Sequence, residues 1–248
     1  MIDVQDLHKS FKQQVVLDGA SIFFAEGKIT TILGGSGSGK SVLVKHIIGL
    51  LRPDSGTIVV DGQDLETLDD RELLQVRKKF GYLFQDSALF DFMNVFDNIS
   101  FPLFEHTRLK RSEVQHVVAE KLRLVGLAGI EKKMPSELSG GMKKRVALAR
   151  AVALDPKIII YDEPTTGLDP VMTDTVNDLI ATTQEALGIT TIVISHDIRS
   201  SLRISDFLGL LNEGKIVEFG TPEKVQESEH PMMRLFLAGI ERAPVSKS

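Results

Sequence analysis

The segment Gly34–Ser41 constrains the fold of this chain more than any other stretch. Its residues fit the phosphate-binding pattern G-x-x-x-x-G-K-[ST], and they are Gly34, Gly35, Ser36, Gly37, Ser38, Gly39, Lys40 and Ser41. A β-branched, apolar run precedes the segment at 29–33, and apolar residues with the spacing of a buried helix follow it at 42–48. Strand, glycine loop and helix are the context in which this pattern binds phosphate. The sequence therefore predicts a P-loop within an α/β fold.

The residue types of this P-loop suit a nucleotide and its metal ion. Glycines let backbone N–H groups turn inward around an anion, and the start of the following helix adds partial positive charge. Lys40 is expected to reach the β- and γ-phosphates of ATP, and the Ser41 hydroxyl to hold Mg²⁺. The alternative is a flexible Gly/Ser loop, which the flanking strand and helix disfavour.

Composition narrows the class of protein. The 248 residues carry a net charge of −5 and no cysteine, which excludes disulfides and disfavours a general nucleic-acid binder. The first residues lack the apolar stretch of a signal peptide, and no run approaches the ~18 uninterrupted apolar residues of a membrane span. We therefore expect a cytoplasmic globular protein that does not bind nucleic acid.

The first part of the chain has strand patterns. Short apolar stretches between residues 2 and 33 are broken at Asp18-Gly19 and at Glu26-Gly27-Lys28. The second of these breaks predicts a hairpin turn. This β-rich texture continues to a strand that ends at Gln85.

The middle of the chain, from about Asp86 to Leu154, reads as helical. Ser112 with Gln115 predicts a capping box at the start of one helix, and Ser139 is expected to be the N-cap of another. Strand patterns resume at 158–161 and continue to an antiparallel hairpin at 207–219. A short helix rich in Met, Leu and Phe then precedes a tail at 242–248 that we expect to be loose.

Two adjacent carboxylates end the predicted strand at 158–161. Ligands of open α/β sheets bind outside the carboxyl ends of strands, which is where Asp162 and Glu163 lie. Asp162 is placed to hold Mg²⁺, and Glu163 to polarise an attacking water. The alternative is a solvated strand end leading into the turn at Pro164, and the P-loop elsewhere in the chain disfavours it.

Two further polar residues follow predicted strands. His196 comes directly after the strand at 190–195, where an imidazole can hydrogen-bond a γ-phosphate. Gln85 ends its own strand, where its amide can contact both Mg²⁺ and the water, and it also begins the helical part. Either residue alone would carry little information, so both predictions depend on the P-loop.

The segment Leu138–Met142 predicts a second anion site. Ser139 is a good N-cap, and Gly140 and Gly141 permit close backbone approach. The basic run Lys143–Arg145 is unfavourable near a helix N-terminus unless an anion docks there. The alternative is a solvated basic helix face. Because one P-loop already serves the nucleotide of its own subunit, the second site suggests the phosphate of a partner subunit.

Together these motifs resemble, in order and spacing, those of ABC-transporter ATPase subunits, over roughly residues 1–225. The matching P-loop, Q-loop, signature, second carboxylate motif, D-loop and switch histidine are Gly34–Ser41, Gln85, Leu138–Met142, Ile158–Glu163, Gly167-Leu168-Asp169 and His196. Phe11 matches the aromatic position at which family members stack the adenine, with a place in the strand core as the alternative. Met142 departs from the family, most of whose members have Gln there.

A closer resemblance is to the ATPases of Mla-type, Mce-associated phospholipid transporters of Gram-negative bacteria. It rests on the segments Ser87–Asn98, Met134–Glu137 and Phe236–Ile240. Mla-type members tolerate Met at the position of Met142.

The resemblance implies a fold and its borders. The fold is an α/β P-loop NTPase, with a RecA-like core, an antiparallel β subdomain and an inserted helical subdomain. Residues 1–248 would form a single ABC ATPase domain. Within it, 1–85 and 155–225 would be the catalytic core, 86–154 the helical subdomain with the signature motif, and 226–248 a C-terminal extension.

The resemblance also implies an ATP hydrolase coupled to lipid transport. Glu163, His196 and Gln85 would be catalytic, Ser41, Gln85 and Asp162 would hold Mg²⁺, and the signature residues with Asp169 would bind the nucleotide of a second copy. An integral-membrane permease would dock near Gln85 and the 87–104 segment, at the cytoplasmic face of the inner membrane. A lipid-binding substrate protein and a small regulatory subunit are further partners that the resemblance allows.

Two alternatives share the catalytic motifs. The chain could serve another ABC transporter that imports a small solute, against which the 87–98 segment and the C-terminus argue. It could also be a soluble ABC ATPase of translation or DNA repair. Such proteins usually carry two ATPase units or long coiled-coil arms, and the sequence shows neither.

Overall fold

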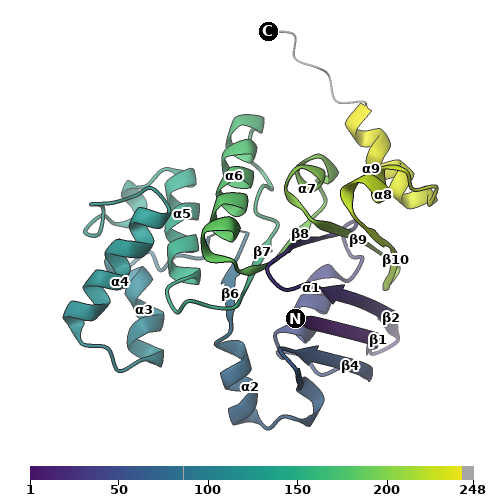
Figure 1. Cartoon of the computed structure of the whole chain (residues 1–248), viewed down its shortest axis with the longest axis horizontal. Coiled ribbons are helices and arrows are strands. Elements are labelled where there is room, and N and C mark those ends of the chain that lie inside the picture. Colours follow the sequence, from purple (N-terminus) through teal and green to yellow (C-terminus); the bar gives the residue numbers. More distant parts are fainter. Residues whose placement is uncertain (86, 242–248) are drawn as a thin grey trace. The chain divides into compact units, whose positions relative to one another are not determined.

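The computed structural model describes residues 1–85 and 87–241, which pack into two compact units (Figure 1). The first unit consists of Met1–Arg77 and the chain from Thr190 onward, and the second of Lys78–Ile189. Both combine strands and helices, so the predicted α/β class is confirmed. The division into catalytic core and helical subdomain, with its borders at 85/86 and 154/155, stays a proposal.

The first unit contains an antiparallel sheet in the order β2-β1-β4-β5. Its strands are β1 (Ile2–Phe11), β2 (Gln14–Phe24), β4 (Ser55–Val60) and β5 (Gln63–Asp64). Asp18-Gly19 does not break a strand, as we had expected, but lies within β2. Gly19, with φ +88°, is the extra residue of a bulge, because Leu7 pairs with Ala20 and His8 with Asp18.

The prediction of a hairpin at Glu26-Gly27-Lys28 was wrong. A turn forms there, but the next strand, β3 (Ile29–Leu33), leaves the antiparallel sheet. Every residue of β3 is buried, and a strand without a polar face suits the middle of a parallel sheet covered on both sides. Burial against distant strands therefore overrode the local turn signal.

β3 lies in a second sheet of the first unit, in the order β10-β9-β3-β8. β8 (Thr190–Ser195) and β9 (Phe207–Asn212) run parallel to β3, and β10 (Lys215–Gly220) forms the predicted antiparallel hairpin with β9. Leu33 is opposite both Ser195 and Leu210. The carboxyl ends of β3 and β8 therefore reach the same edge of the sheet.

Short helices complete the first unit. They are α1 (Lys40–Ile47), η1 (Leu65–Thr67), α2 (Asp70–Arg77), α7 (Ile198–Ile204), α8 (Pro222–Gln226) and α9 (Pro231–Glu241). Met233 of α9 is fully buried in a cluster with Leu208 and Leu210 of β9, which fixes α9 to this unit. Leu235 is exposed. The tail 242–248 lies outside the described residues.

The second unit pairs two parallel strands with four longer helices. They are β6 (Phe80–Leu83), β7 (Ile158–Asp162), α3 (Val95–His106), α4 (Arg111–Leu124), α5 (Gly140–Ala151) and α6 (Pro170–Leu187), with η2 (Pro135–Glu137) before α5. α3, α4 and α5 pack on one another. Between residues 87 and 154, the structure has the predicted helical texture and no strand.

The start of α4 differs from the prediction. Lys110, not Ser112, is the N-cap, and the Glu113 carboxylate accepts a hydrogen bond from the Lys110 backbone N–H at 2.6 Å. The capping box is therefore formed by Lys110 and Glu113, two residues before the predicted pair Ser112 and Gln115. The Ser139 cap of α5 is confirmed, since its hydroxyl accepts from the Met142 N–H at 3.3 Å. In the described part of the chain, no helix has the length and apolar character to span a bilayer.

Candidate functional site

The P-loop joins β3 to α1 at the edge that the carboxyl ends of β3 and β8 share. Gly37 and Gly39 have φ +77° and +105°, a conformation that glycine adopts without strain. A Cβ on Gly34 would lie 2.5 Å from the Ser38 Oγ and 2.6 Å from the Leu211 carbonyl oxygen. A Cβ on Gly39 would lie 2.9 Å from the Val16 carbonyl oxygen. The loop is thus packed too closely for side chains at these points.

Polar groups of the P-loop face inward. The Lys40 ammonium is buried and donates to the carbonyl oxygens of Gly34 at 2.7 Å and Gly35 at 3.0 Å. The Ser38 hydroxyl is also buried and has no hydrogen-bond partner in the structure. A Cβ at Gly35 or Gly37 would meet open space. A buried cation, an orphaned hydroxyl and free room beside the glycines fit a bound phosphate.

A cavity of about 350 Å³ lies against the P-loop. Gly37 and Ser38 form one side of it, and the rest comes from β2 and the β9–β10 turn: Gln14, Val15, Val16, Asp18, Glu213 and Gly214. Phe11 does not line this cavity. It is 43% exposed at the end of β1, with the Lys9 Nζ 5.7 Å from its ring centroid. The strand-core alternative for Phe11 is therefore wrong, and its stacking role stays a prediction.

His196 reaches the same edge from β8. It follows Ser195, which lies opposite Leu33, so His196 and Gly34 leave neighbouring parallel strands at corresponding positions. The side chain is exposed, and Asp197 beside it caps α7 by accepting from the Arg199 N–H at 3.0 Å. The structure therefore brings together the P-loop and His196, as the strand-end argument predicts.

The second unit repeats this arrangement with the other strand-end residues. β6 and β7 are parallel, and Leu83 lies opposite Tyr161. Gln85 and the carboxylates Asp162 and Glu163 therefore leave the sheet at one edge. The Tyr82 hydroxyl donates to Asp162 Oδ2 at 2.8 Å. Burial and this hydrogen bond raise the pKa of Tyr82, so that it stays a donor at neutral pH.

Glu163 has a strained backbone. Its φ is +50°, in the left-handed region that residues other than glycine rarely adopt. The Thr166 hydroxyl donates to Glu163 Oε2 at 2.9 Å and holds the carboxylate. A non-glycine residue in this conformation is typical of positions whose side chain must point in one set direction. Sequence reasoning found Glu163 but missed both Tyr82 and Thr166, which no local pattern marks.

The signature segment begins α5, with Ser139 and Gly140 exposed. Two of the three basic residues after it have hydrogen-bond partners within the second unit. Lys144 donates to the Pro164 carbonyl, and Arg145 to the Val125 carbonyl at 3.4 Å. The carbonyls accept these bonds without cancelling the positive charge, so the second anion site stays a prediction. A Cβ on Gly141 would lie 2.6 Å from the Met172 Cε of α6.

Asp169 is the N-cap of α6. Its carboxylate accepts from the backbone N–H groups of Val171 at 2.9 Å and Met172 at 3.0 Å. This bond pattern gives Asp169 a structural role, and its part in nucleotide binding stays a prediction.

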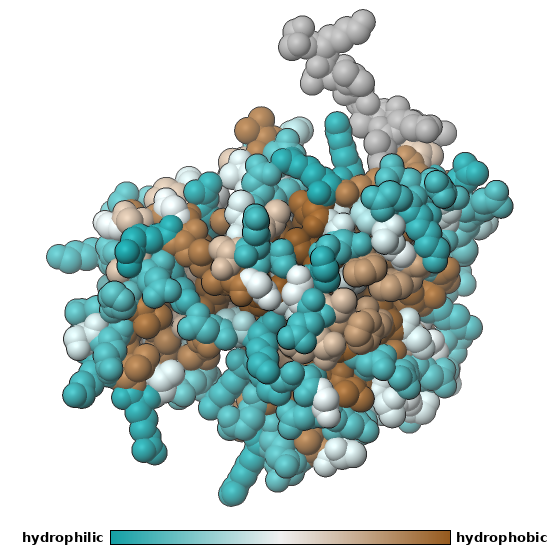
Figure 2. All heavy atoms as spheres, viewed as in Figure 1, coloured by the Kyte–Doolittle hydropathy of each residue, from teal (hydrophilic) through white to brown (hydrophobic). Residues whose placement is uncertain are grey.

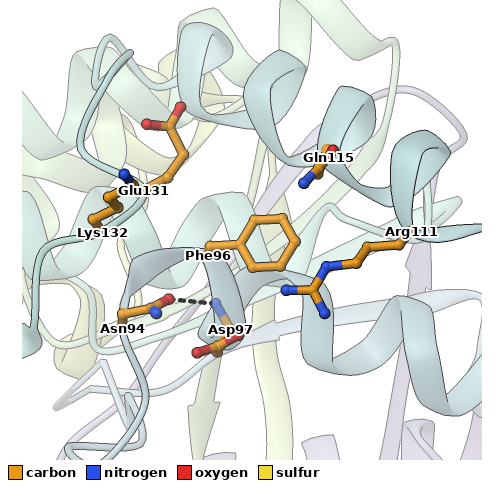
Figure 3. Close-up of a pocket in the computed structure, with 7 residues that line it drawn as sticks. All are labelled: Asn94, Phe96, Asp97, Arg111, Gln115, Glu131 and Lys132. Carbon is orange, nitrogen blue, oxygen red and sulfur yellow. Dashed lines mark hydrogen bonds between the residues drawn. The ribbon is translucent and has the colours of Figure 1, made fainter.

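A second hollow of about 470 Å³ lies in the second unit, lined by none of the predicted site residues (Figure 3). The Phe96 ring stands in its middle, between Arg111 on one side and Glu131 with Lys132 on the other. Asn94, Asp97 and Gln115 complete the lining. Two cations and two anions balance one another there, so the hollow has no charge preference for phosphate.

No cluster of three or more His, Asp or Glu side chains that could hold a metal ion occurs within residues 1–85 and 87–241. A divalent ion would need few protein ligands and further oxygens from elsewhere. Within the second unit, Gln85 and Asp162 leave one sheet edge, and their amide and carboxylate oxygens are of the kind that suits Mg²⁺.

Comparisons with known proteins agree with these observations. A family model described as ABC transporter matches residues 17–166. The "Probable ribonucleotide transport ATP-binding protein mkl" of Mycobacterium tuberculosis is 44% identical over all of this chain and 69% of its own length. The "Intermembrane phospholipid transport system ATP-binding protein MlaF" of Haemophilus influenzae is 44% identical over 99% of this chain and 93% of its own.

Among solved structures, a dimeric post-hydrolysis state of the ATP-binding cassette MJ0796, bound to ADP and Pi, has a TM-score of 0.79 and 30% identity. The match covers 90% of this chain and 99% of that chain.

Proposed function

This chain belongs to the ABC transporter family and has the ABC ATPase fold, and we propose that it is the ATP-hydrolysing subunit of a phospholipid transporter. One observation carries the choice of substrate. The chain matches 93% of the length of the phospholipid-transport relative from Haemophilus influenzae, but 69% of the ribonucleotide-transport relative from Mycobacterium tuberculosis. Identity is equal for the two, so the difference in coverage decides.

ATP binding is assigned to the P-loop. The glycine backbone cradles the phosphates, the Lys40 ammonium pairs with the β- and γ-phosphates, and the Ser41 hydroxyl holds Mg²⁺. The buried ammonium and the orphaned Ser38 hydroxyl support this assignment. Phe11 stacks on the adenine, and its 43% exposure leaves a ring face available.

Hydrolysis is assigned to the strand-end residues. Glu163 accepts a proton from the attacking water, Gln85 orients that water, and His196 hydrogen-bonds the γ-phosphate. Asp162 and Gln85 complete the donor set for Mg²⁺, which when bound neutralises charge on the phosphates. The Tyr82 hydroxyl keeps the Asp162 carboxylate oriented, and the Thr166 hydroxyl does the same for Glu163.

A second copy of the chain completes each nucleotide site. Ser139, Gly140, Gly141 and Asp169 of one subunit serve the nucleotide on the P-loop of its partner. The dimeric state of the MJ0796 cassette supports this. Glu163→Gln with MgATP should trap a closed dimer, and adding Ser139→Arg should prevent closure while ATP still binds. A distance probe between the P-loop of one subunit and residue 139 of its partner follows closure. Closure that survives Ser139→Arg would refute the shared site.

An exposed aromatic patch supports a permease as partner. Phe92 is 77% exposed, Phe101 39% and Phe104 48%, and apolar surface gathers where α3 and α4 lie in the view of Figure 2. Val95 also lies in the 87–104 segment where docking is expected, but it is fully buried in the core. We place the chain at the cytoplasmic face of the inner membrane through this contact, with a lipid-binding substrate protein and a small regulatory subunit as further partners.

Reconstitution tests the substrate. The tagged chain is purified from a detergent extract, its co-purifying permease is identified by mass spectrometry, and the complex is placed in vesicles. ATP hydrolysis should be faster in phospholipid vesicles than in lipid-free detergent, and at constant ATP it should not change when another ribonucleotide, such as CMP, is added. Stimulation by ribonucleotides alone would favour the second candidate function, suggested by the name of the mycobacterial relative. A Glu163→Gln complex is the control for hydrolysis by other proteins.

A further inference from the structure

The segment that follows Gln85 has an unusual backbone. Ser87 and Ala88 have φ +64° and +44°, so two consecutive residues other than glycine lie in the left-handed region. This conformation is disfavoured for each of them by contact between Cβ and the carbonyl oxygen. Such a segment persists only when surrounding contacts hold it.

Arg150 of α5 supplies these contacts. Its Nη2 donates to the Ser87 carbonyl oxygen at 3.0 Å, and its Nη1 to the Ala88 carbonyl oxygen at 2.9 Å. The guanidinium also lies 5.7 Å from the ring centroid of Phe90. The planar guanidinium donates from two nitrogen atoms and so reaches both carbonyl oxygens at once. A lysine ammonium has one nitrogen and cannot reproduce this geometry.

Asn98 of α3 holds the same segment further along. It is fully buried, and its Oδ1 accepts from the Phe90 N–H at 2.9 Å. Its Nδ2 donates to the carbonyl oxygens of Met93 at 2.9 Å and Asn94 at 3.1 Å. The stretch 87–94 is therefore fixed from two helices. The Ser87 N–H also donates to the Phe84 carbonyl oxygen at 3.0 Å, which ties Ser87 to the residue before Gln85.

We propose that Arg150 is a positioning residue for ATP hydrolysis: its guanidinium fixes Ser87 and Ala88 and thereby the place of the Gln85 amide. Arg150 lies on the helix that begins with the signature residue Ser139. Phe90, beside the guanidinium, packs on Phe92 and Phe101 of the exposed aromatic patch, with ring centroids 5.7 and 5.3 Å apart. This proposal rests on the proposed catalytic role of Gln85.

The test compares binding with turnover in the full-length chain. Arg150→Met should lower kcat by about 10- to 100-fold, the usual cost of a catalytic group displaced by an ångström. The Kd for MgATP should stay within about threefold, because the Arg150 guanidinium donates to Ser87, Ala88 and Asn98, which lie outside the P-loop. Arg150→Lys should lose less than Arg150→Met.

Two further variants separate positioning from general stability. In a Gln85→Ala background, Arg150→Met should add little further loss, since residues that act as a unit are not additive. Arg145→Met is the matched control on the same helix. It removes a bond to the Val125 carbonyl and should leave kcat near the wild-type value. Hydrogen exchange in residues 87–94 should speed up in Arg150→Met and not in Arg145→Met.

Each outcome decides the question. Wild-type turnover in Arg150→Met, full additivity with Gln85→Ala, or an equal loss in Arg145→Met overturns the positioning role. If Gln85→Ala itself hydrolyses ATP at the wild-type rate, the role of Gln85 is wrong and this proposal falls with it. Absence of ATPase activity in the wild-type complex with its permease would refute the proposed function instead. If thermal melting shows Arg150→Met to be unfolded, Arg150→Lys carries the same comparisons.

Discussion

In the first unit the P-loop keeps its shape because two of its glycines pack too closely to admit a Cβ, whereas in the second unit side chains hold the segments around Gln85 and Glu163. Gly34 and Gly39 pack against backbone carbonyls at distances that leave no room for a Cβ. Ser87, Ala88 and Glu163 instead carry side chains at positive φ. Hydrogen bonds from Arg150 and Thr166 act on these segments.

This difference matches the two tasks. Binding a phosphate requires a cradle that is the same before and after binding, and close glycine packing provides one. Hydrolysis, as proposed above, depends on a second copy of the chain, so the residues that carry it must respond to that partner. A strained backbone held by a few long-range hydrogen bonds has two accessible arrangements more readily than a close-packed loop. Substitutions at the catalytic residues of the second unit should therefore change turnover, whereas substitution of the phosphate-binding lysine in the first unit should change the affinity for MgATP.

The largest expected effect is on turnover in the second unit. Glu163→Gln preserves the shape of the side chain and removes the charge that polarises water, so hydrolysis should fall about 10²- to 10⁴-fold. MgATP affinity, measured by calorimetry, should be retained. Glu185→Gln, at an exposed position of α6, is the control and should hydrolyse ATP normally. Near wild-type turnover in Glu163→Gln would move the base to another residue, with His196 the first to examine.

The next effect is on affinity in the first unit. Lys40→Ala removes charged hydrogen bonds to the phosphates, each worth about 1.5–3 kcal/mol, so MgATP should bind about 100-fold more weakly or worse. Lys45→Ala, on the exposed face of α1, should bind like the wild type. Calorimetry that finds unchanged affinity in Lys40→Ala would contradict the phosphate role of this residue.

The sequence predicted the first region well because its determinants are local. The glycine pattern, the buried strand before it and the helix after it lie within twenty residues. Strand-end logic also predicted that His196 would join the P-loop and that Gln85 would join Asp162 and Glu163, since parallel strands end at one edge.

The supports of the second region were not predictable because their partners are distant in sequence. Tyr82 and Asp162 are 80 positions apart, and Arg150 and Ser87 are 63 apart. No periodic pattern marks such pairs. The hairpin at Glu26-Gly27-Lys28 failed for the same reason: β3 pairs with β8 and β9, strands more than 150 residues further along. The hydrogen bonds of Lys144 and Arg145 to carbonyls 20 positions away were not predicted either.

A smaller effect is expected on the stability of two P-loop variants, Gly34→Ala and Gly35→Ala. Gly34→Ala places a methyl group 2.5 Å from the Ser38 Oγ and 2.6 Å from a backbone carbonyl, and such overpacking costs about 1–3 kcal/mol. Gly35→Ala meets nothing within 4 Å and should unfold at nearly the wild-type denaturant concentration. Equal stability of the two variants would show that the P-loop relaxes, and that its rigidity is not what separates it from the second region.

The smallest expected effect is a gain in the free energy of unfolding, and it concerns the segment after Gln85 in the second unit. Ala88 is exposed and has φ +44°, so Ala88→Gly relieves a left-handed strain of about 1–2 kcal/mol per residue. The greater freedom of glycine in the unfolded chain offsets about 0.4–1 kcal/mol of this, so a net gain of roughly 0.5 kcal/mol is expected in urea unfolding. The backbone carbonyl that Arg150 binds is retained.

Ala119→Gly, inside α4, is the matched control and should lose about 1 kcal/mol, as alanine-to-glycine changes in helices do. If Ala88→Gly instead destabilises the chain as Ala119→Gly does, the segment after Gln85 stores no strain, and the contrast between a cradle shaped by glycine and a segment held by Arg150 loses its energetic basis.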